Sequence, residues 1–256
     1  MPLQIGIVLL GATISLPYAL AVSSVYLPWI ALFVIASFVV GLMLGKLLGI
    51  HHRVAFLLSS GAAICGGTAM AAVAPIIKAK PQELLIAMTI IFLLNAVAII
   101  VFPLVGNYLE MNNFEFGAWA ALAIHDTGSV IGSALTFSNE SAEVAATLKL
   151  GRTIWLIPLI LITNWIFNKQ AQATKFPRFI LFFILAIVAN TVFTFNEQII
   201  NILQISSQTF LLIGLFCIGS QFDPNELNSI SGKPLLLALM LWALVIPSAY
   251  FLVKYF

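Results

Sequence analysis

The sequence predicts an all-α, polytopic transmembrane helical bundle. Hydrophobic residues make up 62% of the 256 residues, and charged residues only 8%. A soluble domain carries about a quarter charged residues. The apolar runs are long and continuous, whereas a β-barrel would show short alternating segments. We expect one integral membrane domain over residues 1–256, and the net charge of +2 gives no reason to expect a nucleic-acid partner.

About nine membrane segments are expected, since a helix needs about 20 apolar residues to cross a bilayer. They are predicted at 3–21, 27–49, 54–77, 83–106, 116–137, 143–168, 177–195, 207–221 and 234–255. The connections between them are short. Lys46, Arg53 and Lys233 fall on one side, which predicts that this side is cytoplasmic. Lysines also occur on the opposite side, so the orientation stays open.

Small and polar residues interrupt the predicted segment at 54–77. Adjacent glycines weaken a helix, at about 1 kcal/mol each relative to alanine. A break there would expose backbone N–H groups at the start of a half-helix, an end that suits an anion. The alternative is a continuous helix that packs tightly through small residues. The substrate-binding groups expected here are Ser60, Cys65, Gly66, Gly67 and Thr68.

The predicted segment at 116–137 contains Asp126, the only carboxylate expected inside an apolar stretch of membrane length. An ionisable group at membrane depth is costly and indicates a functional site. His125 precedes it, and histidine titrates near neutral pH, so the pair is a candidate for proton coupling. Asp126 can also cap a half-helix that starts at Thr127. The two interpretations are compatible. The flanking Thr-Gly and Gly-Ser steps predict that the helix is interrupted there.

Lys149 and Arg152 are three residues apart and therefore share a helix face. If that face points inward, they provide positive charge for an anionic substrate or partners for Asp126. If it points outward, they extend to the lipid headgroups. We favour the inward interpretation because Arg152 lies deep in its segment.

A faint internal similarity links the two ends of the chain. Ile5-Gly6 with Gly11 resembles Ile213-Gly214 with Gly219, and each group precedes an apolar segment. Inverted repeats of this kind are typical of transporters. The alternative is that small residues recur because they let membrane helices pack closely.

Several kinds of chemistry are disfavoured. The chain has no ATP-binding motif and no metal-ligand spacing, and its two cysteines, Cys65 and Cys217, lie in apolar stretches. We therefore expect no cofactor, no bound metal and no structural disulfide. An enzyme is disfavoured because no second buried carboxylate or histidine is expected beside His125 and Asp126.

Five motifs resemble, in order and spacing, the YeiH-type sulfate exporter family. They are Ser-Gly-Ala-Ala-Ile-Cys-Gly-Gly (60–67), Ala-Pro-Ile-Ile-Lys-Ala (74–79), Ile-His-Asp (124–126), Lys-Leu-Gly-Arg (149–152) and Lys-Pro-Leu-Leu-Leu-Ala (233–238). The resemblance implies a bacterial inner-membrane protein with inverted repeats and broken helices, similar to sodium/proton antiporters. Members of the family carry about two or three further helices, of about 20 residues each, before the segment that matches 3–21. This chain is expected to lack those helices.

The functional hypothesis is a secondary transporter that exports a small anion, sulfate or a sulfonate, with protons as the coupling ion. Its site would lie between the broken segments, with Lys149 and Arg152 adding charge and with His125 and Asp126 carrying the proton. Two alternatives stay open. One is a cation/proton antiporter or channel in which Asp126 binds the cation. The other is a non-transporting membrane subunit or scaffold. A homo-oligomer is one option for the assembly.

Overall fold

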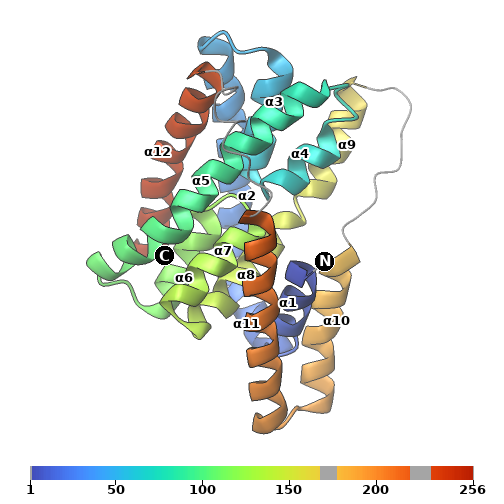
Figure 1. Cartoon of the computed structure of the whole chain (residues 1–256), viewed down its shortest axis with the longest axis vertical. Helices are drawn as coiled ribbons and strands as arrows, with labels where there is room; N and C mark the ends of the chain where they lie inside the picture. Colours follow the sequence, from blue (N-terminus) through green and yellow to red (C-terminus); the bar gives the residue numbers. More distant parts are fainter. Residues whose placement is uncertain (1, 168–177, 220–231, 256) are drawn as a thin grey trace.

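A computed structural model describes residues 2–167, 178–219 and 232–255, and every regular element in these ranges is an α-helix (Figure 1). The connection after the segment predicted at 143–168, and the end of the segment predicted at 207–221, lie outside the described residues. The helices are α1 (Pro2–Gly11), α2 (Leu16–Leu47), α3 (His52–Ala63), α4 (Gly67–Val73), α5 (Pro81–Tyr108), α6 (Asn113–Ala123), α7 (Thr127–Phe137), α8 (Asn139–Thr153), α9 (Leu156–Phe167), α10 (Arg178–Phe193), α11 (Glu197–Gly219) and α12 (Gly232–Tyr255).

The predicted boundaries near the N-terminus are wrong. A single segment was expected at 3–21, but α1 ends at Gly11 and α2 runs without a break through the expected connection to Leu47. Ser15 is extended at the N-cap of α2, and a proline follows within its first two positions. Proline suits that place because its missing N–H would lack a helical partner there anyway. Pro28, which the prediction placed at the start of a new segment, lies inside α2.

Four stretches in the described residues are long and apolar enough to cross a membrane: Pro28–Leu47, Pro81–Tyr108, Asn139–Phe167 and Gly232–Tyr255. The predicted membrane class is thus supported, but the count of nine segments is not confirmed. Large apolar side chains on these helices face outward, and Leu104 and Trp165 are 66% and 83% exposed. Such a surface is what a lipid environment requires, since a soluble protein rarely exposes large contiguous apolar patches.

Two of the predicted segments are broken helices, as the sequence analysis expected. The segment at 54–77 divides into α3 and α4, and the segment at 116–137 divides into α6 and α7. Gly66 provides the first break with φ +61° and ψ −124°, which glycine adopts readily because it has no Cβ. At the second break Ile124 is extended, with φ −86° and ψ 139°. A further interruption, between α8 and α9, was not predicted.

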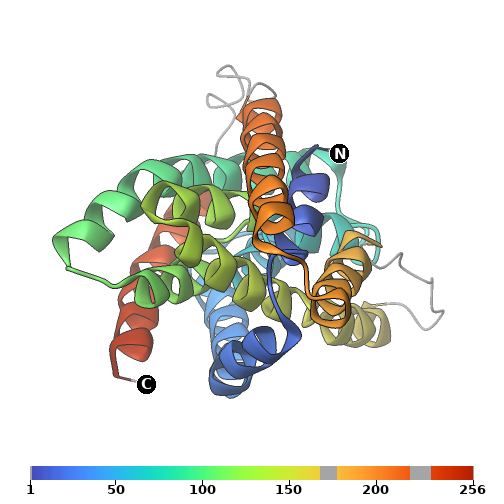
Figure 2. The same cartoon turned by 90° about the horizontal axis from the view of Figure 1, so that it is seen from below.

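The helices form two groups in space. α6, α7 and α8 pack together at the centre, with α2, α3, α5 and α12 around them, whereas α1, α10 and α11 form a separate group at one end (Figures 1 and 2). The Ser207 hydroxyl of α11 donates to the Gly6 carbonyl of α1 at 2.8 Å. The inverted repeat is not confirmed. The close approach of Gly11 to Phe183 of α10 supports the alternative, in which small residues allow close packing.

Candidate functional site

The two helix breaks meet each other in the centre of the molecule. A Cβ built on Gly66 would lie 3.2 Å from the Cβ of Asp126 and 3.3 Å from its Cα. The contact therefore leaves little room for a side chain at position 66. Residues about 60 positions apart in the chain thus bring four half-helix ends together: the carbonyl ends of α3 and α6, and the amino ends of α4 and α7. We call this meeting point the crossing.

Arg152 satisfies the carbonyl end of α3. The last four carbonyls of a helix lack partners within it, and leaving them unpaired in the membrane is costly. In α3, the carbonyls of residues 60 and 61 accept from backbone N–H groups beyond the helix end. The remaining two accept from the guanidinium of Arg152: Nη2 lies 2.5 Å from the Ala62 oxygen, and Nε lies 2.6 Å from the Ala63 oxygen. Every orphan carbonyl of α3 is therefore paired.

The carbonyl end of α6 is satisfied in the same way, by three side chains from two other helices. Arg152 Nη1 donates to the Leu122 oxygen at 2.6 Å and to the Ala121 oxygen at 3.2 Å. Trp242 Nε1 of α12 donates to the Ala123 oxygen at 3.1 Å. Lys149 Nζ donates at 2.6 Å to the carbonyl of residue 124, just beyond the helix. Positive charge at a helix carboxyl end also complements the helix dipole.

Asp126 occupies the opposite kind of helix end. It is the N-cap of α7, and its carboxylate accepts from the backbone N–H of Ser129 at 3.2 Å and from the Ser129 hydroxyl at 3.3 Å. A carboxylate at a helix amino terminus is favourable because the exposed N–H groups carry partial positive charge. The predicted cap is confirmed. Among the described residues Asp126 forms no ion pair, so the option in which Lys149 or Arg152 pairs with it is not seen.

The crossing also contains polar atoms that no hydrogen bond satisfies within the described residues. Neither ring nitrogen of His125 has a hydrogen bond of good geometry, although the Ala62 backbone is close enough to interact with the ring. Asn95 of α5 accepts from the His125 backbone N–H at 3.3 Å through Oδ1, and its Nδ2 has no partner. His125 is 1% exposed and Asn95 2%. Buried polar groups of this kind require an explanation, such as bound water, an ion or a ligand.

The residues predicted to bind substrate lie in different environments. The Ser60 hydroxyl donates to the Leu57 carbonyl of its own helix at 2.8 Å, which favours a local role. Cys65 is 1% exposed and lies beside the charged groups of the crossing. The Gly66 N–H donates to the Gly61 carbonyl at 2.9 Å. The expectation that this N–H faces an anion is therefore not supported.

The other predicted substrate-binding residues divide into two sets. A Cβ on Gly67 would meet the Phe92 ring at 3.1 Å, and Thr68 is exposed on the outer side of α4. Lys149 and Arg152 point inward as predicted, and both are 0% exposed. Their N–H groups donate to carbonyl oxygens, however. The structure therefore supports a role in holding the helix ends, and it shows no contact that assigns them to a substrate.

The sequence analysis did not single out three polar residues. Asn95 contacts the backbone of the second break. Trp242 completes the end of α6. Away from the crossing, Glu143 lies in the second turn of α8 and is half-buried, although the predicted segment at 143–168 starts with it. No local pattern joins Asn95 or Trp242 to its partner, because the contacting residues are 30 and 119 positions apart in the chain.

The fold and the site define a class: an all-helical membrane protein in which two broken helices meet around buried charges. The chain belongs to the family described as Conserved hypothetical protein 698, which matches residues 1–238. A UPF0324 membrane protein of Bacteroides thetaiotaomicron is 38% identical over 95% of this chain and 74% of its own length. Relatives of the same name from Vibrio parahaemolyticus and Shewanella oneidensis are 38% and 35% identical, and each is matched over 80% of its length.

These matches establish the family and the membrane class without naming a substrate. The sulfate export that the resemblance to YeiH-type exporters implied therefore stays a prediction. The relatives are longer than this chain, but the matches do not place their additional residues, so the prediction of missing N-terminal helices is not supported. No solved structure matches the chain.

Proposed function

We propose that the protein is a secondary transporter that exports a small anion, sulfate or a sulfonate, from the bacterial cell in exchange with protons. The observation that carries this proposal is the crossing itself. Two broken helices meet at Gly66 and Asp126, with Lys149 and Arg152 fully buried beside them. Transporters place their sites where discontinuous helices meet near the membrane midplane. Buried charges at membrane depth are rare and usually functional.

The balance of charge at the crossing favours an anion. It contains two cationic side chains, Lys149 and Arg152, and one carboxylate, Asp126. Electrostatic interactions are stronger in a region of low dielectric than in water, so this excess attracts a negative ion. Carbonyl oxygens already accept from most N–H groups of the two cations, with two contacts to Lys149 Nζ and four to the Arg152 guanidinium. Lys149 and Arg152 would therefore attract the anion mainly through their electrostatic field. The unpaired Asn95 Nδ2 and the His125 ring would supply direct hydrogen bonds.

His125 and Asp126 would provide the coupling. The cap that Asp126 makes on α7 depends on a charged acceptor, and hydrogen bonds to an ionised acceptor are stronger than those to a neutral one. Protonation of Asp126 would weaken its bonds to Ser129 and loosen the start of α7. Proton binding and the position of a half-helix would thus be linked at one residue.

The test is proton-coupled flux in proteoliposomes, with the His125→Ala/Asp126→Asn double variant compared with the unaltered protein. Sulfate uptake driven by a pH gradient should be lost in the double variant. Glu110→Gln provides the control, because Glu110 is an exposed carboxylate in the turn between α5 and α6. Full proton-coupled flux in the double variant would remove His125 and Asp126 from the coupling mechanism.

One observation favours a second candidate, a cation/proton antiporter. Carbonyls accept from Lys149 and Arg152, and the Asp126 carboxylate forms no ion pair within the described residues, although the charge of Lys149 acts on it. In this mechanism its carboxylate would bind a sodium ion and a proton alternately. Proton flux that follows the sodium gradient and is indifferent to the anion would support the antiporter. Proton flux that depends on which anion is supplied and does not change with the sodium gradient would support the exporter.

A further inference from the structure

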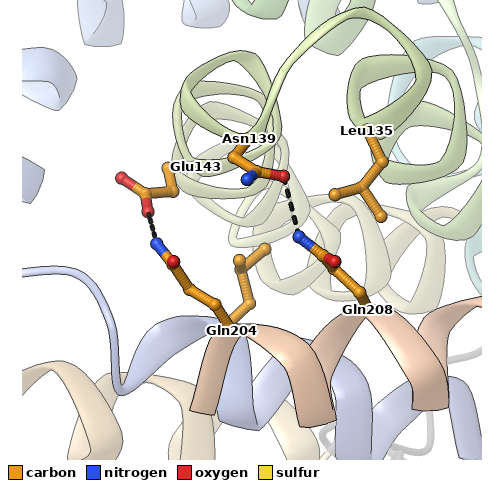
Figure 3. Close-up of a pocket in the computed structure, with 6 residues that line it drawn as sticks. Leu135, Asn139, Glu143, Gln204 and Gln208 are labelled. Carbon is orange, nitrogen blue, oxygen red and sulfur yellow. Dashed lines mark hydrogen bonds between the residues drawn. The ribbon is translucent and has the colours of Figure 1, made fainter. Parts of the chain in front are cut away.

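A second polar cluster lies away from the crossing, where α11 packs against the start of α8 (Figure 3). Two side chains come from α8, Asn139 and Glu143, and two come from α11, Gln204 and Gln208. The side chains of Asn139 and Gln208 point toward each other, as do those of Glu143 and Gln204 (Figure 3). This is the junction between the central helices and the group of α1, α10 and α11. We call these four residues the junction cluster.

The Glu143 carboxylate is weakly bonded. Gln204 Nε2 lies 3.4 Å from its Oε1, and the Thr13 hydroxyl lies 3.5 Å from the same atom. Both distances are at the long limit for hydrogen bonds, and the described residues provide no bond to Oε2. By contrast, Gln208 Nε2 donates to Asn139 Oδ1 at 2.8 Å. The neutral pair of the junction cluster is therefore well bonded, while the charged member is not.

The surroundings of Glu143 supply no compensating positive charge. The side chain is half-buried in a stretch that is apolar enough to cross a membrane, and it has no ion pair among the described residues. The titratable groups that act on it are Glu140, a like charge one turn earlier, and Tyr18 of α2. The neighbours from α7, α11 and the turn after α1 are uncharged. A carboxylate in such a place favours an added positive charge.

The space at the junction limits what can supply that charge. The cavity has a volume of about 10 Å³ and is lined by Leu10 and Leu135 as well as by the junction cluster. That volume is close to the least that holds one water molecule. A sulfate or sulfonate does not fit, and a carboxylate would repel it. A proton, delivered by water, fits without any displacement of the helices.

We propose that Glu143 is a second proton-binding site of this protein, separate from the crossing. The proton comes from water and forms one O–H bond to a carboxylate oxygen, and no other covalent bond changes. A protonated carboxyl donates one hydrogen bond, and the side-chain oxygen of Gln204 accepts it once the amide has rotated. Protonation of Glu143 therefore reverses the direction of the hydrogen bond between Glu143 of α8 and Gln204 of α11. The proposal does not rest on anion export.

Infrared difference spectroscopy of the full chain in lipid tests the proposal directly. The sample is shifted between neutral and mildly acidic pH, and the carbonyl band of protonated carboxyl groups is recorded. We expect a band that Glu143→Gln removes and that Glu140→Gln leaves in place, because Glu140 is exposed on the same helix. Glutamine keeps the size and hydrogen-bonding capacity of glutamate, so the Glu143 variant should fold. A spectrum in which every carboxyl band of the unaltered protein survives Glu143→Gln, or an unaltered protein without any such band, would overturn the assignment.

Two further arms separate this site from the crossing and from a metal ion. The Asp126→Asn variant should keep the Glu143 band, even if anion export fails in every assay. Loss of that band in Asp126→Asn would assign the proton to the crossing and contradict a separate site. The titration is also run with sodium in place of potassium at equal ionic strength. An unchanged band supports a proton site, and a band that sodium abolishes at fixed pH shows that the carboxylate binds the metal ion.

Discussion

The Arg152→Lys variant tests whether one guanidinium holds the two broken helices at the crossing. Arg152 donates through Nε, Nη1 and Nη2 to the carbonyls of residues 62, 63, 121 and 122, which belong to the ends of α3 and α6. Lysine keeps the positive charge but offers a single nitrogen in place of a planar fork. It can therefore reach one helix end but not both.

The expected cost follows from the bonds that lysine cannot replace. A hydrogen bond to a charged group contributes about 1.5–3 kcal/mol, and interhelical bonds within membranes contribute less, up to ~1.7 kcal/mol. Two carbonyls at one helix end lose their partner, and both are deep in the protein because Arg152 is 0% exposed. We therefore expect Arg152→Lys to lower the free energy of unfolding by about 3 kcal/mol.

The assay is equilibrium unfolding in mixed micelles, followed by tryptophan fluorescence. Arg53→Lys is the matched control, because Arg53 is partly exposed and its nearest carboxylate oxygen, on Glu83, is 3.9 Å away. That change should cost less than ~1 kcal/mol. If Arg152→Lys unfolds at the same denaturant concentration as the unaltered protein, the guanidinium does not hold the helix ends.

Three further predictions follow from the crossing. Gly66→Ala should lower the free energy of unfolding by ~1–3 kcal/mol because of its positive φ, whereas Gly151→Ala, with open space around it, should raise that energy by up to ~1 kcal/mol. Equal changes in the free energy of unfolding for Gly66→Ala and Gly151→Ala would contradict this prediction. Asp126→Asn should lower that free energy by less than ~1 kcal/mol, since asparagine keeps an uncharged oxygen that can cap α7, yet abolish proton-coupled flux. Cys65, in a Cys217→Ser background, should react with a water-soluble thiol reagent faster when sulfate is present. Mass spectrometry measures the rate, and no dependence on sulfate would argue against opening of the crossing.

The features that the sequence predicts correctly depend on strong local signals. Adjacent glycines at 66 and 67 indicated the first break, the Thr-Gly and Gly-Ser steps after Asp126 indicated the second, and the lone carboxylate indicated its cap. The inward direction of Lys149 and Arg152 followed from their depth in an apolar segment. Each of these inferences used residues within about one helix turn of each other.

The features that the sequence does not predict depend on contacts between distant residues. The bonds of Arg152 to residues 62 and 63 join parts of the chain that are 90 and 89 positions apart. No periodicity indicates such a pairing, so the sequence analysis considered an anion, Asp126 and lipid headgroups as partners but not backbone carbonyls. Glu143 was assigned to a segment end because it lies at the border of an apolar run, but residues far from it in the chain, Thr13 and Gln204, lie against its carboxylate. A new segment was predicted to begin at residue 27, but α2 continues through this position and through Pro28.

Electrogenic flux in proteoliposomes tests the central claim most directly. A panel of sulfate, sulfonates, chloride and sodium is applied at two pH values, with Asp126→Asn as the reference variant. The exporter mechanism predicts a current that is specific for one of the anions, depends on pH and is lost in Asp126→Asn. A folded protein that gives no current with any member of the panel would contradict a transport function and indicate an accessory membrane subunit.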